Sequence, residues 1–136
     1  MLRVGLEVCD PTVFDALETD DILFMDGSHR SFINSDVTVF MLDVMPRLKP
    51  GVLIHVHDIQ LPWDYPDMFV PWYWTEAYIL ADYIIGAASR LRPVFPTAWI
   101  CRHLGFKDWF ATPPVDLGAQ NDGWRGGGSM WFTHTG

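Results

Sequence analysis

The chain has 136 residues, which is about the length of one domain. With 49% apolar and 19% charged residues, its composition is typical of a globular protein and argues against a disordered one. The formal net charge of -8 argues against general nucleic-acid binding and against anionic membrane surfaces, because the phosphate groups of both repel an acidic protein.

The cysteines and the N-terminus indicate the compartment. Cys9 and Cys101 lie far apart and neither is part of a Cys-x-x-Cys pair, so we expect two buried, reduced thiols and neither a zinc site nor a disulfide framework. The first residues lack the apolar stretch of a secretory signal, and no apolar run reaches the ~18 residues of a membrane span. We therefore expect a cytoplasmic protein without a membrane partner.

The first half of the chain predicts a strand, a helix and a second strand. A short amphipathic segment at 13–17 has Asp10 placed to start a helix. Four consecutive apolar residues within 21–26 are typical of a fully buried strand of a parallel sheet. Apolar residues at spacings of three and four predict a helix over 35–45, and an apolar strand follows at 52–58. This order indicates a crossover unit with two parallel strands.

The second half begins with a loop rich in proline and aromatic residues at 61–74. The apolar spacing predicts a helix over 75–88, a short strand at 98–101 and a closing strand at 129–134. The polar, glycine-rich segment 116–128 is predicted to be a surface loop. These elements make an α/β fold, with two antiparallel strands expected at one edge of the sheet.

Acids and histidines follow the two predicted parallel strands. The first strand ends at Asp26 and the second at His57 and Asp58, so these side chains and His29 should converge where ligands bind in open α/β sheets. Two close carboxylates repel each other, and a divalent cation such as Mg²⁺ or Mn²⁺ resolves that conflict. A histidine in the loop, His29, can act as a general base near neutral pH.

Structural roles compete with these assignments. Asp26 can instead cap the turn that follows its strand, and His55 is interpreted as a hydrogen-bonded core histidine or one behind the ligands. The aromatic residues of the 61–74 loop can pack under the loop or form the wall of a substrate pocket, and spacing does not decide between these. They are Trp63, Tyr65, Phe69, Trp72, Tyr73 and Trp74.

Several segments together resemble class I S-adenosylmethionine-dependent methyltransferases, in the branch that contains small-molecule and sugar O-methyltransferases. They read DILFMDGSH at 21–29, MPRLKPGVLIHVHDI at 45–59, LPWDYP at 61–66 and GGGSMWF at 126–132. The resemblance extends from about residue 8 to residue 134. It implies a Rossmann-like sheet of seven strands, with six parallel and the seventh antiparallel, of which this chain would supply the fourth to seventh.

The resemblance also implies site roles. In metal-dependent sugar O-methyltransferases, acids that end the fourth and fifth strands hold the cation, which corresponds to Asp26 and Asp58. His57 stands where some relatives carry a carboxylate, and we include it among the metal ligands. The resemblance assigns to His29 the removal of the proton from the substrate hydroxyl.

Cofactor binding is the other implication of the resemblance. Asp10 lies in the segment that contacts the adenine ring in relatives, and Asp26 and Gly27 are further candidate contacts of S-adenosylmethionine. The glycine-rich turn after the first strand of such enzymes has no counterpart in residues 1–136, so we expect a partial domain that binds S-adenosylmethionine weakly or not at all. A half sheet would expose an edge that invites pairing with a second copy.

Two functions from different classes are open at this point. One is methyl transfer to a hydroxyl of a sugar or another small metabolite, assisted by a metal. The other is a non-catalytic remnant that keeps the fold and a metal or partner site. Binding of the methyl donor discriminates between them.

Overall fold

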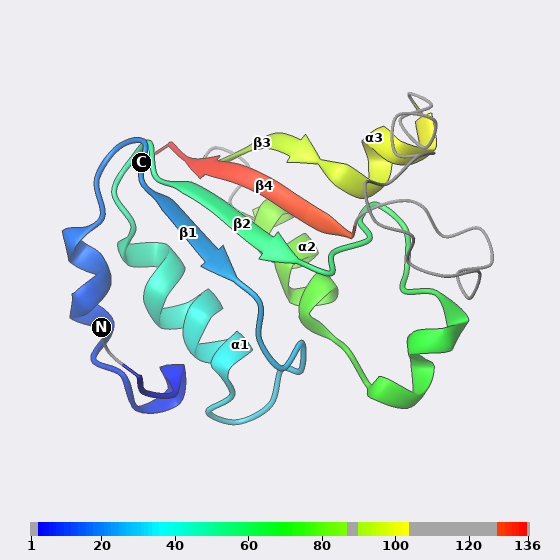
Figure 1. Cartoon of the computed structure of the whole chain (residues 1–136), viewed down its shortest axis with the longest axis horizontal. Helices are drawn as coiled ribbons and strands as arrows, with labels where there is room; N and C mark the ends of the chain where they lie inside the picture. The colour runs from blue at the N-terminus through cyan, green and yellow to red at the C-terminus, as the bar shows by residue number, and fades with distance from the viewer. Residues whose placement is uncertain (1–2, 87–89, 104–127, 136) are drawn as a thin grey trace, which may run out of the picture.

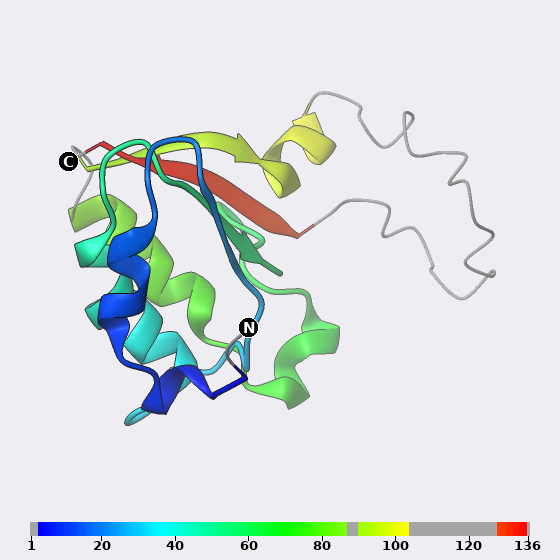
Figure 2. The ribbon, with the colours of Figure 1, turned by 60° about the vertical axis from the view of Figure 1, so that its left-hand side comes forward.

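The computed structural model describes residues 3–86, 90–103 and 128–135, which form an open four-stranded mixed sheet with its main helices on one face (Figure 1, Figure 2). The strand order is β1–β2–β4–β3. The strands are β1 (Ile22–Met25), β2 (Leu53–His57), β3 (Leu91–Pro96) and β4 (Ser129–His134). As predicted, β1 and β2 are parallel, and β4 is antiparallel to both of its neighbours, β2 and β3.

Strand β1 is half-exposed, although its sequence predicts a fully buried strand. Met25 is buried, whereas Ile22 and Phe24 are 58% and 56% exposed. The reason is that β1 lies at an edge of the described sheet and its outer face is covered by no helix that the structure describes. An edge of this kind leaves backbone groups free to pair, and pairing there with a second copy stays a prediction.

The helix predicted at 35–45 is present as one continuous helical segment. It consists of α1 (Asp36–Val39), a π-helical turn (Phe40–Val44) and a 3₁₀ turn (Met45–Arg47). The side chain of Ser35 starts it by accepting a hydrogen bond from the backbone N–H of Thr38. The apolar residues whose spacing predicted the helix are all buried: Val37, Phe40, Met41, Val44 and Met45.

Helix α2 (Glu76–Gly86) completes the covered face of the sheet, in agreement with the helix predicted at 75–88 as far as the described residues extend. Its buried residues are Glu76, Ala77 and Leu80. The core between helices and sheet includes Ile54, Val56 and Phe132, which are almost completely inaccessible to solvent. These strand residues alternate with the residues of the opposite face, as the two-residue period of a strand requires.

The strand predicted at 98–101 is wrong: these residues belong to α3 (Thr97–His103), and the strand lies just before it, in β3. Pro93 and Pro96 both lie within β3. Proline is tolerated in β3 because, among the described strands, this one pairs with β4 alone and lies at an edge of the sheet, which is where strands accommodate proline. The loop predicted at 116–128 lies outside the described residues except for Gly128.

The N-terminal segment forms two short 3₁₀ helices, Leu6–Val8 and Pro11–Ala16, the second of which replaces the helix start expected at 13–17. Another short 3₁₀ helix spans Asp67–Trp72. Cys101 is buried, Cys9 is partly exposed, and both are free thiols. None of the described helices combines the length and the apolar character that crossing a bilayer requires.

Candidate metal and acid–base site

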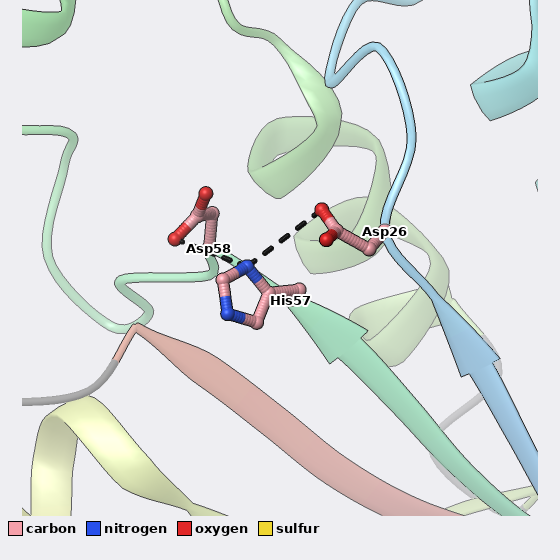
Figure 3. Close-up of side chains that lie close together, drawn as sticks. All are labelled: Asp26, His57 and Asp58. Atoms are coloured by element: carbon pink, nitrogen blue, oxygen red, sulfur yellow. Dashed lines mark ion pairs between the residues drawn. The ribbon is translucent and has the colours of Figure 1, made fainter.

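Three side chains meet at the carboxyl ends of β1 and β2 (Figure 3). Asp26 follows β1 directly, His57 is the last residue of β2, and Asp58 comes next. The His57 Nδ1 atom lies 3.7 Å from Asp26 Oδ1 and 3.3 Å from Asp58 Oδ1. The parallel pairing of the two strands thus brings together the residues that the sequence placed at their ends.

The donor set of this cluster fits a divalent cation. One atom each from Asp26, His57 and Asp58 lies within 4.8 Å of the others, and His57 Nδ1 is buried without a hydrogen-bond partner among the described residues. The side chains of Asp26 and Asp58 are 47% and 28% exposed, so water can complete the coordination. Two carboxylates, one imidazole and water suit Mn²⁺, and Mg²⁺ more weakly because of the imidazole.

His29 lies beside the two acids and is almost completely buried. Its Nε2 atom is 3.5 Å from Asp26 Oδ1 and 3.7 Å from Asp58 Oδ2. Its backbone is in the left-handed region, with φ of 58°. Such a conformation is uncommon for a residue with a side chain and is concentrated at functional sites. The structure therefore directs the ring of His29 at the acidic cluster, as the loop position in the sequence predicts.

The partner of His29 on its other side is Glu76, which we did not anticipate from the sequence. His29 Nδ1 lies 2.8 Å from Glu76 Oε2, and the Glu76 side chain is only 1% exposed at the start of α2. Burial lowers the pKa of His29, but the hydrogen bond and the charges of Glu76, Asp58 and Asp26 outweigh burial and raise it. Burial raises the pKa of Glu76, and the hydrogen bond with His29 lowers it only in part.

A sequence signal for Glu76 existed. It lies four residues before the buried Leu80, on the apolar side of the predicted helix, where a carboxylate is costly unless it has a partner. The pairing could not be predicted because His29 and Glu76 are 47 positions apart in the sequence.

Two helices fix the loop that carries His29. The backbone carbonyl of His29 accepts hydrogen bonds from the N–H groups of Thr75 and Glu76. The backbone N–H and the hydroxyl of Ser28 both donate to the carboxylate of Asp36, at the start of α1. A Cβ atom at Gly27 would press on the ends of the Asp36 and Met25 side chains, which would have to shift to make room. The structure thus gives Gly27 a packing role, and cofactor contact at this residue stays a prediction.

One aromatic residue of the 61–74 loop, Trp74, lies against the His29 ring, and other rings of the loop pack against Trp74. The ring of Trp74 lies 4.2 Å from that of His29, and Trp74 in turn contacts Tyr65, Phe69 and Trp72. Burial raises the pKa of Tyr65, whose hydroxyl accepts a hydrogen bond from the N–H of Ala77. These rings pack together and form one wall beside the histidine.

Asp10 has a structural role in the described residues. Its side chain accepts a hydrogen bond from the N–H of Thr12 and so caps the second 3₁₀ helix. That hydrogen bond, together with the charge of Arg47, lowers the pKa of Asp10. Contact of Asp10 with a cofactor stays a prediction.

His55 lies in the sheet, on the same face as His57. It is 7% exposed, between the ring of Phe24 at 4.7 Å and that of Trp131 at 4.3 Å. The expected hydrogen bond is missing at Nδ1, which finds no partner among the described residues. Burial lowers the pKa of His55, because the interior disfavours the charged ring.

Replacing His55 with phenylalanine is expected to stabilise the fold by about 1 kcal/mol, because it removes a buried polar atom without a partner and keeps the ring. The gain should grow on acidification. Because the pKa of His55 is lowered in the folded parent, the unfolded parent binds a proton at this residue first as the pH falls below about 6.5. The parent therefore loses stability on acidification through His55, and the phenylalanine variant does not. Thermal melts of both proteins at neutral and mildly acidic pH measure this, and a smaller gain at acidic pH would contradict it.

The first part of the chain is similar to a known kind of domain. Residues 6–59 match a family model described as a methyltransferase domain, and this segment contains Asp26, His29, His57 and Asp58. No curated protein and no solved structure matches the chain. A mixed α/β fold with an open four-stranded sheet is compatible with such a domain. The match supports a methyltransferase-like function and suggests the use of S-adenosylmethionine.

Proposed function

We propose that the site at the ends of β1 and β2 serves the transfer of a methyl group from S-adenosylmethionine to a hydroxyl of a sugar or another small metabolite. One observation carries this proposal: Asp26, His29 and Asp58 converge within the segment that matches a methyltransferase domain. The strand order β1–β2–β4–β3, with β4 antiparallel to its neighbours, supports the further proposal that the sheet is the second half of a Rossmann-like methyltransferase sheet.

Asp26, His57 and Asp58 are the residues that would hold a divalent cation in this scheme. A bound cation supplies Lewis acidity that lowers the pKa of a substrate hydroxyl. The two acids are exposed enough for a substrate oxygen to reach them from solvent. The same carboxylates keep the surroundings of His29 negative, which favours a proton on this ring.

His29 is the base in this scheme. Its Nε2 accepts the proton of the substrate hydroxyl, and the resulting oxygen nucleophile forms the new O–CH₃ bond. S-adenosylmethionine supplies the methyl group, and its S–CH₃ bond breaks to leave S-adenosylhomocysteine. The buried Glu76 beside Nδ1 stabilises the charge that the ring gains.

The test is a methyl-transfer assay on the purified chain, with S-adenosylmethionine, Mn²⁺ or Mg²⁺, and a panel of sugars and small hydroxyl compounds. Because we expect this chain to bind S-adenosylmethionine weakly at best, the assay uses the methyl donor at high concentration. We then expect slow formation of S-adenosylhomocysteine that depends on both an acceptor and the cation. If the chain binds the cation but neither binds nor consumes S-adenosylmethionine in calorimetry and the assay, the non-catalytic metal site replaces this proposal.

A further inference from the structure

We propose that Glu76 is a positioning residue that fixes His29 in the Nδ1–H tautomer, which leaves the lone pair of Nε2 facing Asp26 and Asp58. This inference rests on the proposed role of His29 as the base. It deepens that role because a neutral imidazole has one hydrogen on two nitrogens, and only the unprotonated nitrogen can accept a proton.

The distances decide which nitrogen holds the hydrogen. His29 Nδ1 lies 2.8 Å from Glu76 Oε2, which is the length of a strong hydrogen bond. His29 Nε2 lies 3.5 Å from Asp26 Oδ1, which is at the limit of hydrogen bonding, and 3.7 Å from Asp58 Oδ2, which is beyond it. The single hydrogen of the neutral ring therefore lies between His29 and Glu76.

The burial of Glu76 strengthens the preference of the hydrogen for His29 Nδ1. The side chain of Glu76 is 1% exposed, whereas the side chains of Asp26 and Asp58 are exposed to water, which competes for their hydrogen bonds. The second oxygen of Glu76, Oε1, finds no hydrogen-bond partner among the described residues. The bond to His29 is thus the main compensation that the described structure offers for burying this carboxylate.

The rest of the residue is also fixed at the start of α2. The N–H groups of Thr75 and Glu76 donate to the backbone carbonyl of His29, and the ring of Trp74 lies 4.2 Å from the imidazole. The ring therefore has little freedom to turn around and exchange its two nitrogens. Glu76 acts through His29 and does not face the cluster itself.

The test is the ring ¹⁵N spectrum of His29 in the cation-free chain at alkaline pH, where the ring is neutral. We expect a protonated Nδ1 and an unprotonated Nε2 in the parent. Glu76→Ala removes the acceptor, so the hydrogen should move to Nε2, toward Asp26 and Asp58. Glu76→Gln keeps the volume if the alanine variant does not fold, and its neutral amide should raise the Nε2–H population because it is a weaker acceptor.

Asp36→Asn is the matched control, because Asp36 holds the same loop through Ser28 without an observed hydrogen bond to the His29 ring. Its spectrum should equal that of the parent. An Nε2–H tautomer in the parent, or an unchanged tautomer in the folded Glu76 variants, would overturn the inference. The spectra require neither methyl donor nor cation, so this failure is distinguishable from a failure of methyl transfer, which would contradict the proposed function alone.

Discussion

Replacing His29 with asparagine is expected to lower the rate of methyl transfer by ~10²- to 10⁴-fold, the usual contribution of a general base. Asparagine cannot accept the proton of a hydroxyl at this position. It tolerates the left-handed backbone of residue 29, where φ is 58°, better than alanine does. Its amide can also donate a hydrogen bond to the buried Glu76, so this carboxylate keeps a partner. The fold should therefore survive while the chemistry is lost.

The measurement compares kcat for His29→Asn with kcat for His55→Phe, with thermal melts of both variants to establish folding. His55 is the matched histidine because it is also buried close to His57 but lies within the sheet, stacked on Trp131. We expect the His55 variant to keep the parent rate. If instead His55→Phe loses methyl transfer and His29→Asn keeps it, the base is His55 and the assignment of His29 is wrong.

The convergence of the acids could be predicted because it depends on local patterns alone. Apolar runs that end in Asp26 and in Asp58 identify two strands, and the helix between them makes these strands parallel neighbours. Parallel neighbours place their carboxyl ends at one edge of the sheet. No long-range information was needed for this part of the site.

The missed features depend on long-range packing. Glu76 meets His29 because α2 packs against the sheet, and no local pattern encodes that contact. The exposure of Phe24 follows from the position of β1 in the sheet, which its apolar sequence does not reveal. The strand was predicted at 98–101, on a short apolar run, and lies at 91–96 instead. A segment with two prolines forms a strand at the edge of a sheet, and the sequence does not show that this segment lies at an edge.

Replacing Asp58 with asparagine is expected to abolish the rise in melting temperature that Mn²⁺ produces in the parent. An ion at about 100 times its Kd stabilises a folded protein by about 2.7 kcal/mol. The variant loses a charged ligand beside His57 Nδ1, at 3.3 Å, and most of the affinity with it. Asparagine tolerates the left-handed backbone of residue 58, where φ is 56°, so the fold itself should be unaffected.

Without the cation, and at alkaline pH where histidine rings are neutral, the variant should be at least as stable as the parent, because the repulsion between Asp26 and Asp58 is gone and no charged ring is left beside Asp58. Asp67→Asn is the control: it removes the same charge from an exposed position outside the cluster and should leave the Mn²⁺ shift unchanged. Thermal melts of the parent and the two variants, with and without Mn²⁺, show whether Asp58 is a metal ligand or a structural cap. A capping Asp58 would give the opposite result, since its loss would lower the stability of the cation-free chain and leave the response to Mn²⁺ intact.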